Sequence, residues 1–260
     1  MDTKQLFTDM FTLNFRSMRL RWDRLVAVLE RKISGQRISE TGVKKIPVII
    51  NNRNRYTYLL QLVGWLEKNG MENIVILDND STYPPLLDYY AKTSHRVIRL
   101  GDNVGHLALW KSGVFKEFRR QHYIYTDPDV VPDENCPGDA IAFLLKQLEK
   151  YPSIEKIGLG LRIDDLPDHY EGKSKVIDWE KKYWTKPVGE SVFDAEVDTT
   201  FALYRPYTNG AKWVAPAYRT GSPYVARHLP WYENSANPGE ENMYYAKHVR
   251  QGASHWIEKK

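Results

Sequence analysis

The sequence is poor in cysteine, in long apolar runs and in net charge, and each shortage argues against a class of protein. One cysteine in 260 residues, Cys136, excludes a disulfide framework and a cysteine-held metal cluster. No run approaches the ~20 apolar residues of a membrane-spanning helix, and the first residues lack the basic stretch and apolar core of a secretory signal. The net charge of +4 is too small to indicate a nucleic-acid partner. We therefore expect a cytoplasmic protein that binds no nucleic acid.

Hydrophobic residues make up 42% of the chain, enough to bury a sizeable core. From residue 46 onward, short apolar runs at 46–50, 74–77, 97–100 and 123–125 predict strands, and the segments between them have helical spacing. This alternation predicts an α/β fold of Rossmann-like type, in which helices flank a mostly parallel sheet. The second half of the chain is less regular and predicts an extension around the same sheet.

Residues 1–45 have a different character and predict a helical extension that precedes a single domain at 46–260. Apolar residues recur there at helical spacing, and arginines alternate with them. Such a basic amphipathic helix can pack on its own domain, on a second subunit in a homo-oligomer, or on an anionic membrane surface. The last alternative places the protein at the inner face of a membrane as a peripheral component. The residues of this pattern are Leu6, Met10, Leu13, Met18, Trp22, Leu25 and Leu29, with Arg16, Arg19, Arg21, Arg24, Arg31 and Lys32.

Each of the four predicted strands ends in polar residues. Because ligands of parallel α/β sheets bind beyond the carboxyl ends of the strands, these side chains are expected to face one crevice. Their convergence is more specific than any one of them alone. The segments are Asn51-Asn52-Arg53, Asp78-Asn79-Asp80, Asp102-Asn103 and Asp127-Pro128-Asp129.

The last of these segments carries two carboxylates one residue apart at the end of a buried strand. Asp127 and Asp129 can hold a divalent cation together, because Mg²⁺ or Mn²⁺ is usually bound by one or two carboxylates plus substrate phosphates. The pair also matches a phosphatase pattern in which Asp127 would be the nucleophile. That pattern belongs on the first strand of its sheet, whereas three strand-helix units precede Asp127 here.

Four segments, in this order and spacing, resemble the family 2 glycosyltransferases, which use nucleotide sugars on a GT-A fold. The resemblance covers residues 46–135 well and the remainder loosely. The segments are Asn51-Asn52-Arg53-Asn54, then Val75 to Thr82, then Asn103-Val104-Gly105 running into a helix, and finally Tyr125-Thr126-Asp127-Pro128-Asp129.

The resemblance implies a role for each matched position. Asp78 would contact the base or ribose of a nucleotide sugar, most simply a UDP-sugar. Gly105 would let the backbone pass close to the nucleotide, since it has no Cβ. Lys111 would supply positive charge where the family often carries an arginine. The other nucleotide-sugar-binding positions implied are Asn52, Arg53, Asn103 and Asp127.

The resemblance also implies the metal ligands and the catalytic base. Asp127 and Asp129 would bind Mn²⁺ or Mg²⁺, and His228 is the candidate third ligand, since imidazole suits Mn²⁺ tolerably. An enzyme that inverts the sugar needs one carboxylate to take the proton of the acceptor hydroxyl. Asp198 fits that role best, and Glu241 is the alternative. The negative charge of Glu241 could instead stabilise the positive end of a helix dipole.

The function implied is metal-dependent transfer of a sugar from a nucleoside diphosphate donor to a glycan or glycolipid acceptor, in surface polysaccharide synthesis. A non-catalytic carbohydrate-binding module and the phosphatase remain the alternatives. A nucleotidyltransferase would need a glycine-rich loop after the first strand, and the segment 51–55 contains no glycine.

Overall fold

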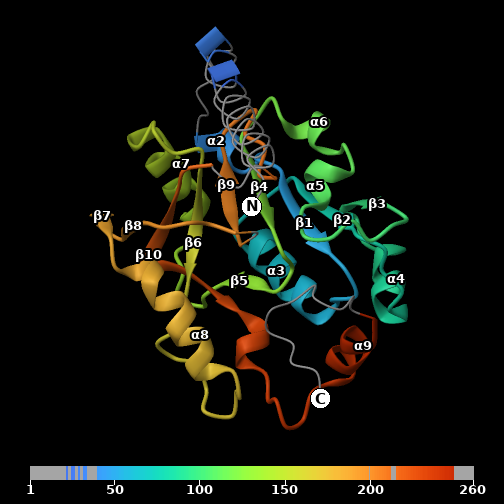
Figure 1. Cartoon of the computed structure of the whole chain (residues 1–260). Coiled ribbons are helices and arrows are strands. Elements are labelled where there is room, and N and C mark those ends of the chain that lie inside the picture. Colours follow the sequence, from blue (N-terminus) through green and yellow to red (C-terminus); the bar gives the residue numbers. More distant parts are fainter. Residues whose placement is uncertain are drawn as a thin grey trace, which may run out of the picture.

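The computed structural model describes residues 40–198, 200–211 and 215–248, together with positions 22, 25, 26, 29, 32 and 33. Within these residues the chain forms one ten-stranded sheet in the order β3-β2-β1-β4-β9-β6-β10-β8-β7, with β5 paired to β10 (Figure 1). The strands are β1 (Val48–Asn52), β2 (Ile74–Asp78), β3 (Arg96–Arg99), β4 (Tyr123–Thr126), β5 (Val130–Pro132), β6 (Lys156–Leu161), β7 (Pro187–Gly189), β8 (Val192–Asp194), β9 (Ala202–Tyr204) and β10 (Ala217–His228).

Helices cover both faces of the sheet, which confirms the predicted α/β class. Parallel pairing joins β1 to β2 and β4, β2 to β3, and β6 to β10, while β9 lies antiparallel between β4 and β6. The helices are α2 (Glu40–Val43), α3 (Thr57–Lys68), α4 (Pro84–Tyr90), α5 (Ala108–Lys111), α6 (Phe115–Phe118), α7 (Ala140–Lys150), α8 (Lys173–Glu180) and α9 (Glu240–His248), with 3₁₀ turns η1 (Lys181–Trp184) and η2 (Leu229–Tyr232).

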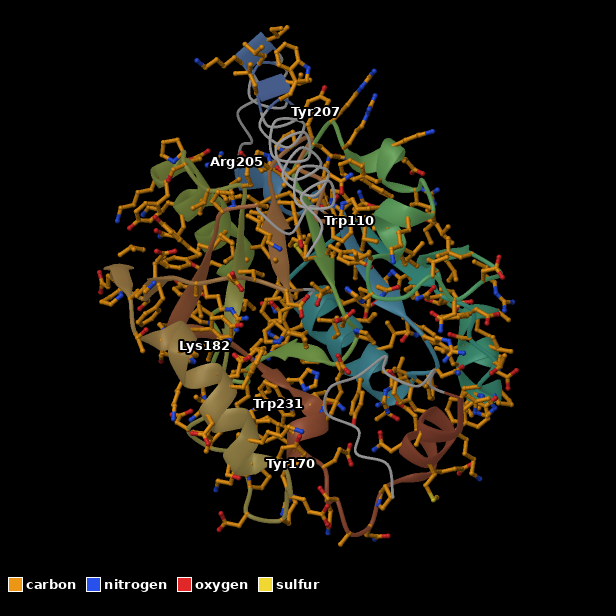
Figure 2. All side chains as sticks on the ribbon, in the orientation of Figure 1. Trp110, Tyr170, Lys182, Arg205, Tyr207 and Trp231 are labelled. Atoms are coloured by element: carbon orange, nitrogen blue, oxygen red, sulfur yellow. The ribbon has the colours of Figure 1, made fainter. Side chains whose placement is uncertain are left out.

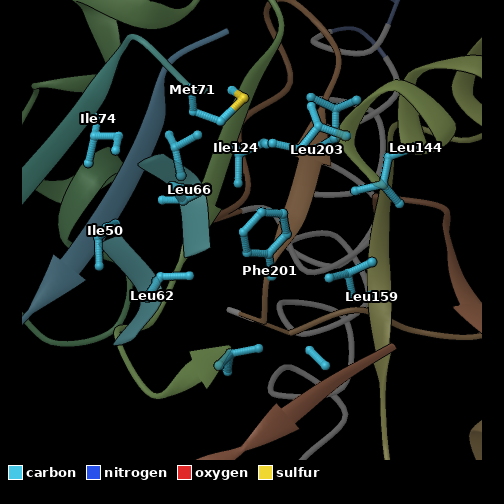
Figure 3. Packing of buried hydrophobic residues seen from close by; sticks show 14 of the residues in the cluster. Ile50, Leu62, Leu66, Met71, Ile74, Ile124, Leu144, Leu159, Phe201 and Leu203 are labelled. Atoms are coloured by element: carbon cyan, nitrogen blue, oxygen red, sulfur yellow. The ribbon is translucent and has the colours of Figure 1, made fainter. Parts of the chain in front are cut away.

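The core has two layers because successive side chains of a strand point to opposite faces. Val48 and Ile50 of β1 lie in the layer beneath α3 and α7, whereas Ile49 lies in the layer beneath α5 and α6. Figure 3 shows the first layer, where Leu62 and Leu66 of α3 pack with buried residues of the central strands. Both faces of β1 are thus buried, which explains why its sequence is a continuous apolar run.

One predicted helix is interrupted. The spacing of Leu107, Trp110, Val114 and Phe118 predicts a single helix, but the chain forms two short helices, α5 and α6. Gly113, between them, has φ of +83°, outside the right-handed helical region. The interruption leaves Trp110 packed across Tyr125, with ring centroids 4.6 Å apart.

The second half of the chain extends the same sheet, as expected. The long strand β10 pairs with β6 and β8 along one part and with β5 along another, and the register to β6 shifts between Thr220 and Val225. No described helix has both the length and the apolar character required to cross a membrane. Most of residues 1–39 lie outside the described residues, so the domain boundary at 45 stays a prediction.

Candidate functional site

The polar strand ends converge at one edge of the sheet. Asn52 at the end of β1 pairs directly with Asp78 at the end of β2, and Ile50 pairs with Thr126, the residue before Asp127. Leu100, after β3, donates its backbone N–H to the carbonyl of Asp78 at 3.0 Å. The ends of four neighbouring parallel strands therefore lie side by side, which is where such sheets bind ligands.

Asn79 ties the loops of this edge together. Its backbone N–H bonds to the carbonyl of Asn52 at 2.8 Å, its side-chain amide donates to the carbonyl of Gly105 at 3.0 Å, and its side-chain oxygen accepts the N–H of Val104 at 2.8 Å. Asn79 is almost completely buried. The loops after β1, β2 and β3 are thus held in one arrangement before any ligand binds.

Buried polar atoms without a partner gather at the end of β1. In the described part of the chain they include the side-chain oxygens of Asn51 and Asn52 and the Nε atoms of Arg53 and Arg55. A buried polar atom without a hydrogen bond costs roughly 1–3 kcal/mol. Such atoms on consecutive residues remain available to a polar ligand or to water.

Asp129 and His228 lie close together. The Nε2 atom of His228 is 3.8 Å from Oδ2 of Asp129, because His228 pairs with Val130 across β10 and β5. The distance is too long for a hydrogen bond, but two atoms that each lie ~2.1 Å from one octahedral cation are roughly 3 to 4 Å apart. Burial lowers the pKa of His228, with Asp129 opposing, and a neutral imidazole is the form that binds metals.

The structure brings together two of the three predicted metal ligands, Asp129 and His228. Among the described residues no group of three or more His, Cys, Asp or Glu side chains is close enough to hold a metal ion. Asp129 and His228 supply two ligands, and Asp127, which is two residues from Asp129, is only partly buried. A cation here would take its remaining ligands from substrate phosphates or water, as Mg²⁺ and Mn²⁺ usually do.

Asp78 is 1% exposed and already has protein partners. Its carboxylate accepts bonds from the backbone N–H of Ser81 at 3.2 Å, from the hydroxyl of Tyr90 at 3.3 Å and from Nε of Arg99 at 3.4 Å. The turn that ends β2 thus uses Asp78 structurally. A contact with a nucleoside would require Tyr90 or Arg99 to give way.

Three further positions predicted to bind the nucleotide sugar follow β3 in the chain. Asn103 accepts the N–H of Gly105 at 3.1 Å, which closes a local turn. Gly105 has φ of +83°, and a Cβ there would meet no atom within 4 Å, so the backbone is open to a ligand. Lys111, at the end of α5, is exposed.

Helix α9 covers the end of β1, and Figure 1 shows it beside the loop that leads into α3. Glu241 accepts bonds from both the N–H and the hydroxyl of Thr57, each at 2.8 Å, and so caps α3. Arg53 donates to the carbonyl of His248 at 2.7 Å. Glu241 is therefore engaged in holding α9 against α3.

Asp198 follows β8 and is exposed. Burial raises the pKa of Tyr204, and the charges of Asp198 and Asp127 raise it further. Unlike Glu241, Asp198 does not cap α3, and its role as the catalytic base stays a prediction.

No family model and no curated protein matches the sequence. Solved structures do resemble the fold. Glucosyl-3-phosphoglycerate synthase from Mycobacterium tuberculosis, in complex with phosphoglyceric acid, is 13% identical over 71% of each chain, with a TM-score of 0.42. GalNAc-T7 with UDP, GalNAc and Mn²⁺ is 12% identical over 68% of this chain and 42% of its own, with a TM-score of 0.44.

A UDP-glucose pyrophosphorylase complexed with UDP-glucose is 10% identical over 78% of this chain and 99% of its own, with a TM-score of 0.45. At these identities and TM-scores the likeness carries no argument about fold or function, and both rest on the residues and the sheet of this chain.

The structure adds residues that the sequence pattern did not single out. Arg55, which follows β1, and Tyr245 of α9 stack on each other, with the guanidinium carbon 3.6 Å from the ring centroid. Trp231 packs against His228, with ring centroids 4.6 Å apart, and Figure 2 shows it at the opposite end of the sheet from Arg205 and Tyr207. The sequence carried one signal for Arg55, its position two residues after the first polar strand end.

Proposed function

We propose that the protein is a metal-dependent glycosyltransferase that moves a sugar, with inversion, from a nucleoside diphosphate donor to a glycan or glycolipid acceptor. The observation that carries the proposal is the approach of His228 to Asp129, 3.8 Å apart, at the edge where four parallel strand ends meet. A sugar-binding module would not need a carboxylate and an imidazole held at this spacing. The acceptor would belong to surface polysaccharide synthesis.

Each group would do one task. Asp129 and His228 would hold Mn²⁺ or Mg²⁺ together with water or the donor's phosphates, and Asp127 would join them only by moving closer. The cation would supply a Lewis acid that neutralises charge on the departing diphosphate. The nucleoside would lie over the loops that Asn79 joins, where the backbone at Gly105 is open.

Asp198 would take the proton of the acceptor hydroxyl as the new bond to the sugar forms. Its exposure gives an acceptor access to the carboxylate. Positive charge builds on the sugar ring as the diphosphate leaves, so the base must act from the face opposite the leaving group.

The donor is identified by thermal unfolding of the full chain with UDP, GDP, CDP or dTDP, each with Mn²⁺ or with EDTA. We expect one nucleotide, UDP by our proposal, to raise the melting temperature by about 5 to 10 °C when present at ~100 times its Kd. The shift should vanish in EDTA, because the metal bridges the protein to the diphosphate. If no nucleotide shifts the transition under either condition, the transferase proposal fails and the sugar-binding module is favoured.

We propose in addition that the N-terminal extension binds an anionic membrane surface. The described apolar residues of this segment are exposed, from 36% for Val26 to 85% for Ile33, and recur at helical spacing: Trp22, Leu25, Val26, Leu29 and Ile33. The same segment of sequence carries Arg21, Arg24, Arg31 and Lys32. An apolar stripe in a segment whose sequence is rich in cations suits the headgroup region of a bilayer that contains acidic lipids.

Sedimentation with vesicles tests this surface. The full chain should bind vesicles of phosphatidylcholine with phosphatidylserine, and binding should weaken at least tenfold in the double variant Leu25→Glu, Leu29→Glu. The control is Leu60→Glu, the same change at an exposed apolar residue of α3. Equal binding by the double variant and the control, or equal binding to neutral vesicles, would contradict the proposal.

A further inference from the structure

Arg55 is a buried cation without a counter-ion in the described part of the chain. The side chain follows β1 and the residue is 8% exposed. Its Nη1 atom donates to the side-chain oxygen of Asn242 at 2.5 Å, and its Nε atom has no partner. Among the described residues no carboxylate forms an ion pair with it, whereas the arginines at 96, 99, 162, 219 and 227 each have one.

Aromatic rings hold this guanidinium in place. Its carbon lies 3.6 Å from the ring centroid of Tyr245, on α9, and 5.1 Å from that of Tyr58, on α3. Asn242 fixes one edge of the guanidinium plane. The side chain is thus fixed by neutral groups while its charge is left uncompensated.

The guanidinium also belongs to the edge of the sheet that carries the aspartate pair. Arg55 follows β1 and Asp127 follows β4, and these neighbouring strands run parallel, with Ile50 paired to Thr126. Arg55 and the aspartate pair therefore follow the same ends of adjacent strands.

An unpaired buried charge is costly, and natural proteins retain one where a ligand of opposite sign completes it. Guanidinium is the side chain best suited to phosphate, because its planar edge can donate two parallel bonds to phosphate oxygens. The carboxylates at 127 and 129 would repel an anion, so an anion near them needs a cation on its other side.

We infer that Arg55 binds the diphosphate of the donor directly, and that Tyr245 and Asn242 of α9 position it to do so. The inference rests on the proposed function and adds the residue that meets the phosphates opposite the metal. It also assigns a role to α9, because Tyr245, whose ring aligns Arg55, lies on that helix. Lys111, which the resemblance offered for this charge, is exposed on α5 and is not required for the contact.

Calorimetric titration of the full chain separates the two halves of the donor. Wild-type protein and Arg55→Gln are titrated with UDP and with uridine in Mn²⁺, or with the matching pair if another nucleotide shifts the wild-type melting temperature. Loss of a charge-assisted contact is expected to weaken binding of the diphosphate about 10- to 100-fold. The nucleoside, which carries no phosphate, should bind both proteins equally.

The control is Arg96→Gln, the same change at a half-exposed arginine of β3 that pairs with Glu117. It should leave both affinities unchanged. If Arg55→Gln unfolds, Arg55→Lys takes its place: it keeps the charge, loses the planar edge and should still weaken the diphosphate more than the nucleoside. The inference about Arg55 is overturned if Arg55→Gln leaves the affinity for the nucleoside diphosphate unchanged, or lowers the affinities for diphosphate and nucleoside equally. Either result leaves the proposed function standing as long as the wild-type protein binds the nucleotide.

Discussion

Replacing Asp129 by alanine is expected to reduce sugar transfer at least a thousandfold while the protein remains folded. The change removes the carboxylate nearest to His228 and with it a ligand of the proposed cation. A metal that stabilises a departing diphosphate is worth several kcal/mol, and ~4 kcal/mol corresponds to roughly a thousandfold in rate. Transfer is measured with the donor found in the thermal-unfolding panel, at saturating Mn²⁺.

The fold should survive because Asp129 contributes its backbone to the structure, through a bond from the N–H of Leu229 at 2.8 Å, and alanine retains that carbonyl. A matched control is Asp194→Ala, since Asp194 also ends a strand but is exposed on β8, near the far edge of the sheet. The control should keep wild-type activity. Near-normal turnover by Asp129→Ala would remove the metal pair from the mechanism.

Replacing Glu180 by alanine should lower the free energy of unfolding by about 3 to 5 kcal/mol, because it breaks a buried ion pair. Glu180, at the end of α8, accepts a bond from Arg219 of β10 at 2.8 Å, and both side chains are 5% exposed. Burial raises the pKa of Glu180 and Arg219 opposes the rise. Without the carboxylate the guanidinium stays buried and unpaired. Urea unfolding at pH 7 measures the loss.

The same helix supplies the control for this experiment. Asp178 pairs with Lys181 at 2.6 Å, but both side chains are mostly exposed, so Asp178→Ala should cost less than about 1 kcal/mol. A double variant, Glu180→Leu with Arg219→Met, should recover much of the lost stability, since no charge remains buried. Equal losses for Glu180→Ala and Asp178→Ala would show that the buried pair is not what joins α8 to the sheet.

The first half of the fold could be predicted from sequence because its signals are local. Buried parallel strands are continuous apolar runs, and polar residues end them, so β1 to β4 were each expected within two residues of where they lie. The strand β10 was not expected. It mixes buried and exposed positions without simple alternation, since it changes partners along its length and its register shifts after Thr220.

The site was predictable in part for the same reason. That four strand ends share an edge follows from parallel pairing, and the proximity of His228 to Asp129 was expected only from the resemblance. The pairing that produces it, between β5 and β10, joins distant segments and leaves no local pattern. The role of Arg55 could not be predicted from the sequence, because it depends on contacts with Tyr245 and Asn242. Helix α9 supplies both residues from a distant part of the chain.

The position of α9 has a consequence for how the protein is made. Arg55 and Asn242 are 187 residues apart in the chain, so translation at 5–20 residues per second separates their emergence from the ribosome by roughly ten to forty seconds. During that interval a nascent polypeptide can assemble the central strands, yet its guanidinium lacks the ring of Tyr245 and the amide of Asn242. Nascent polypeptides from which α9 has not yet emerged should therefore bind the nucleotide weakly, and full affinity should appear only once α9 has emerged.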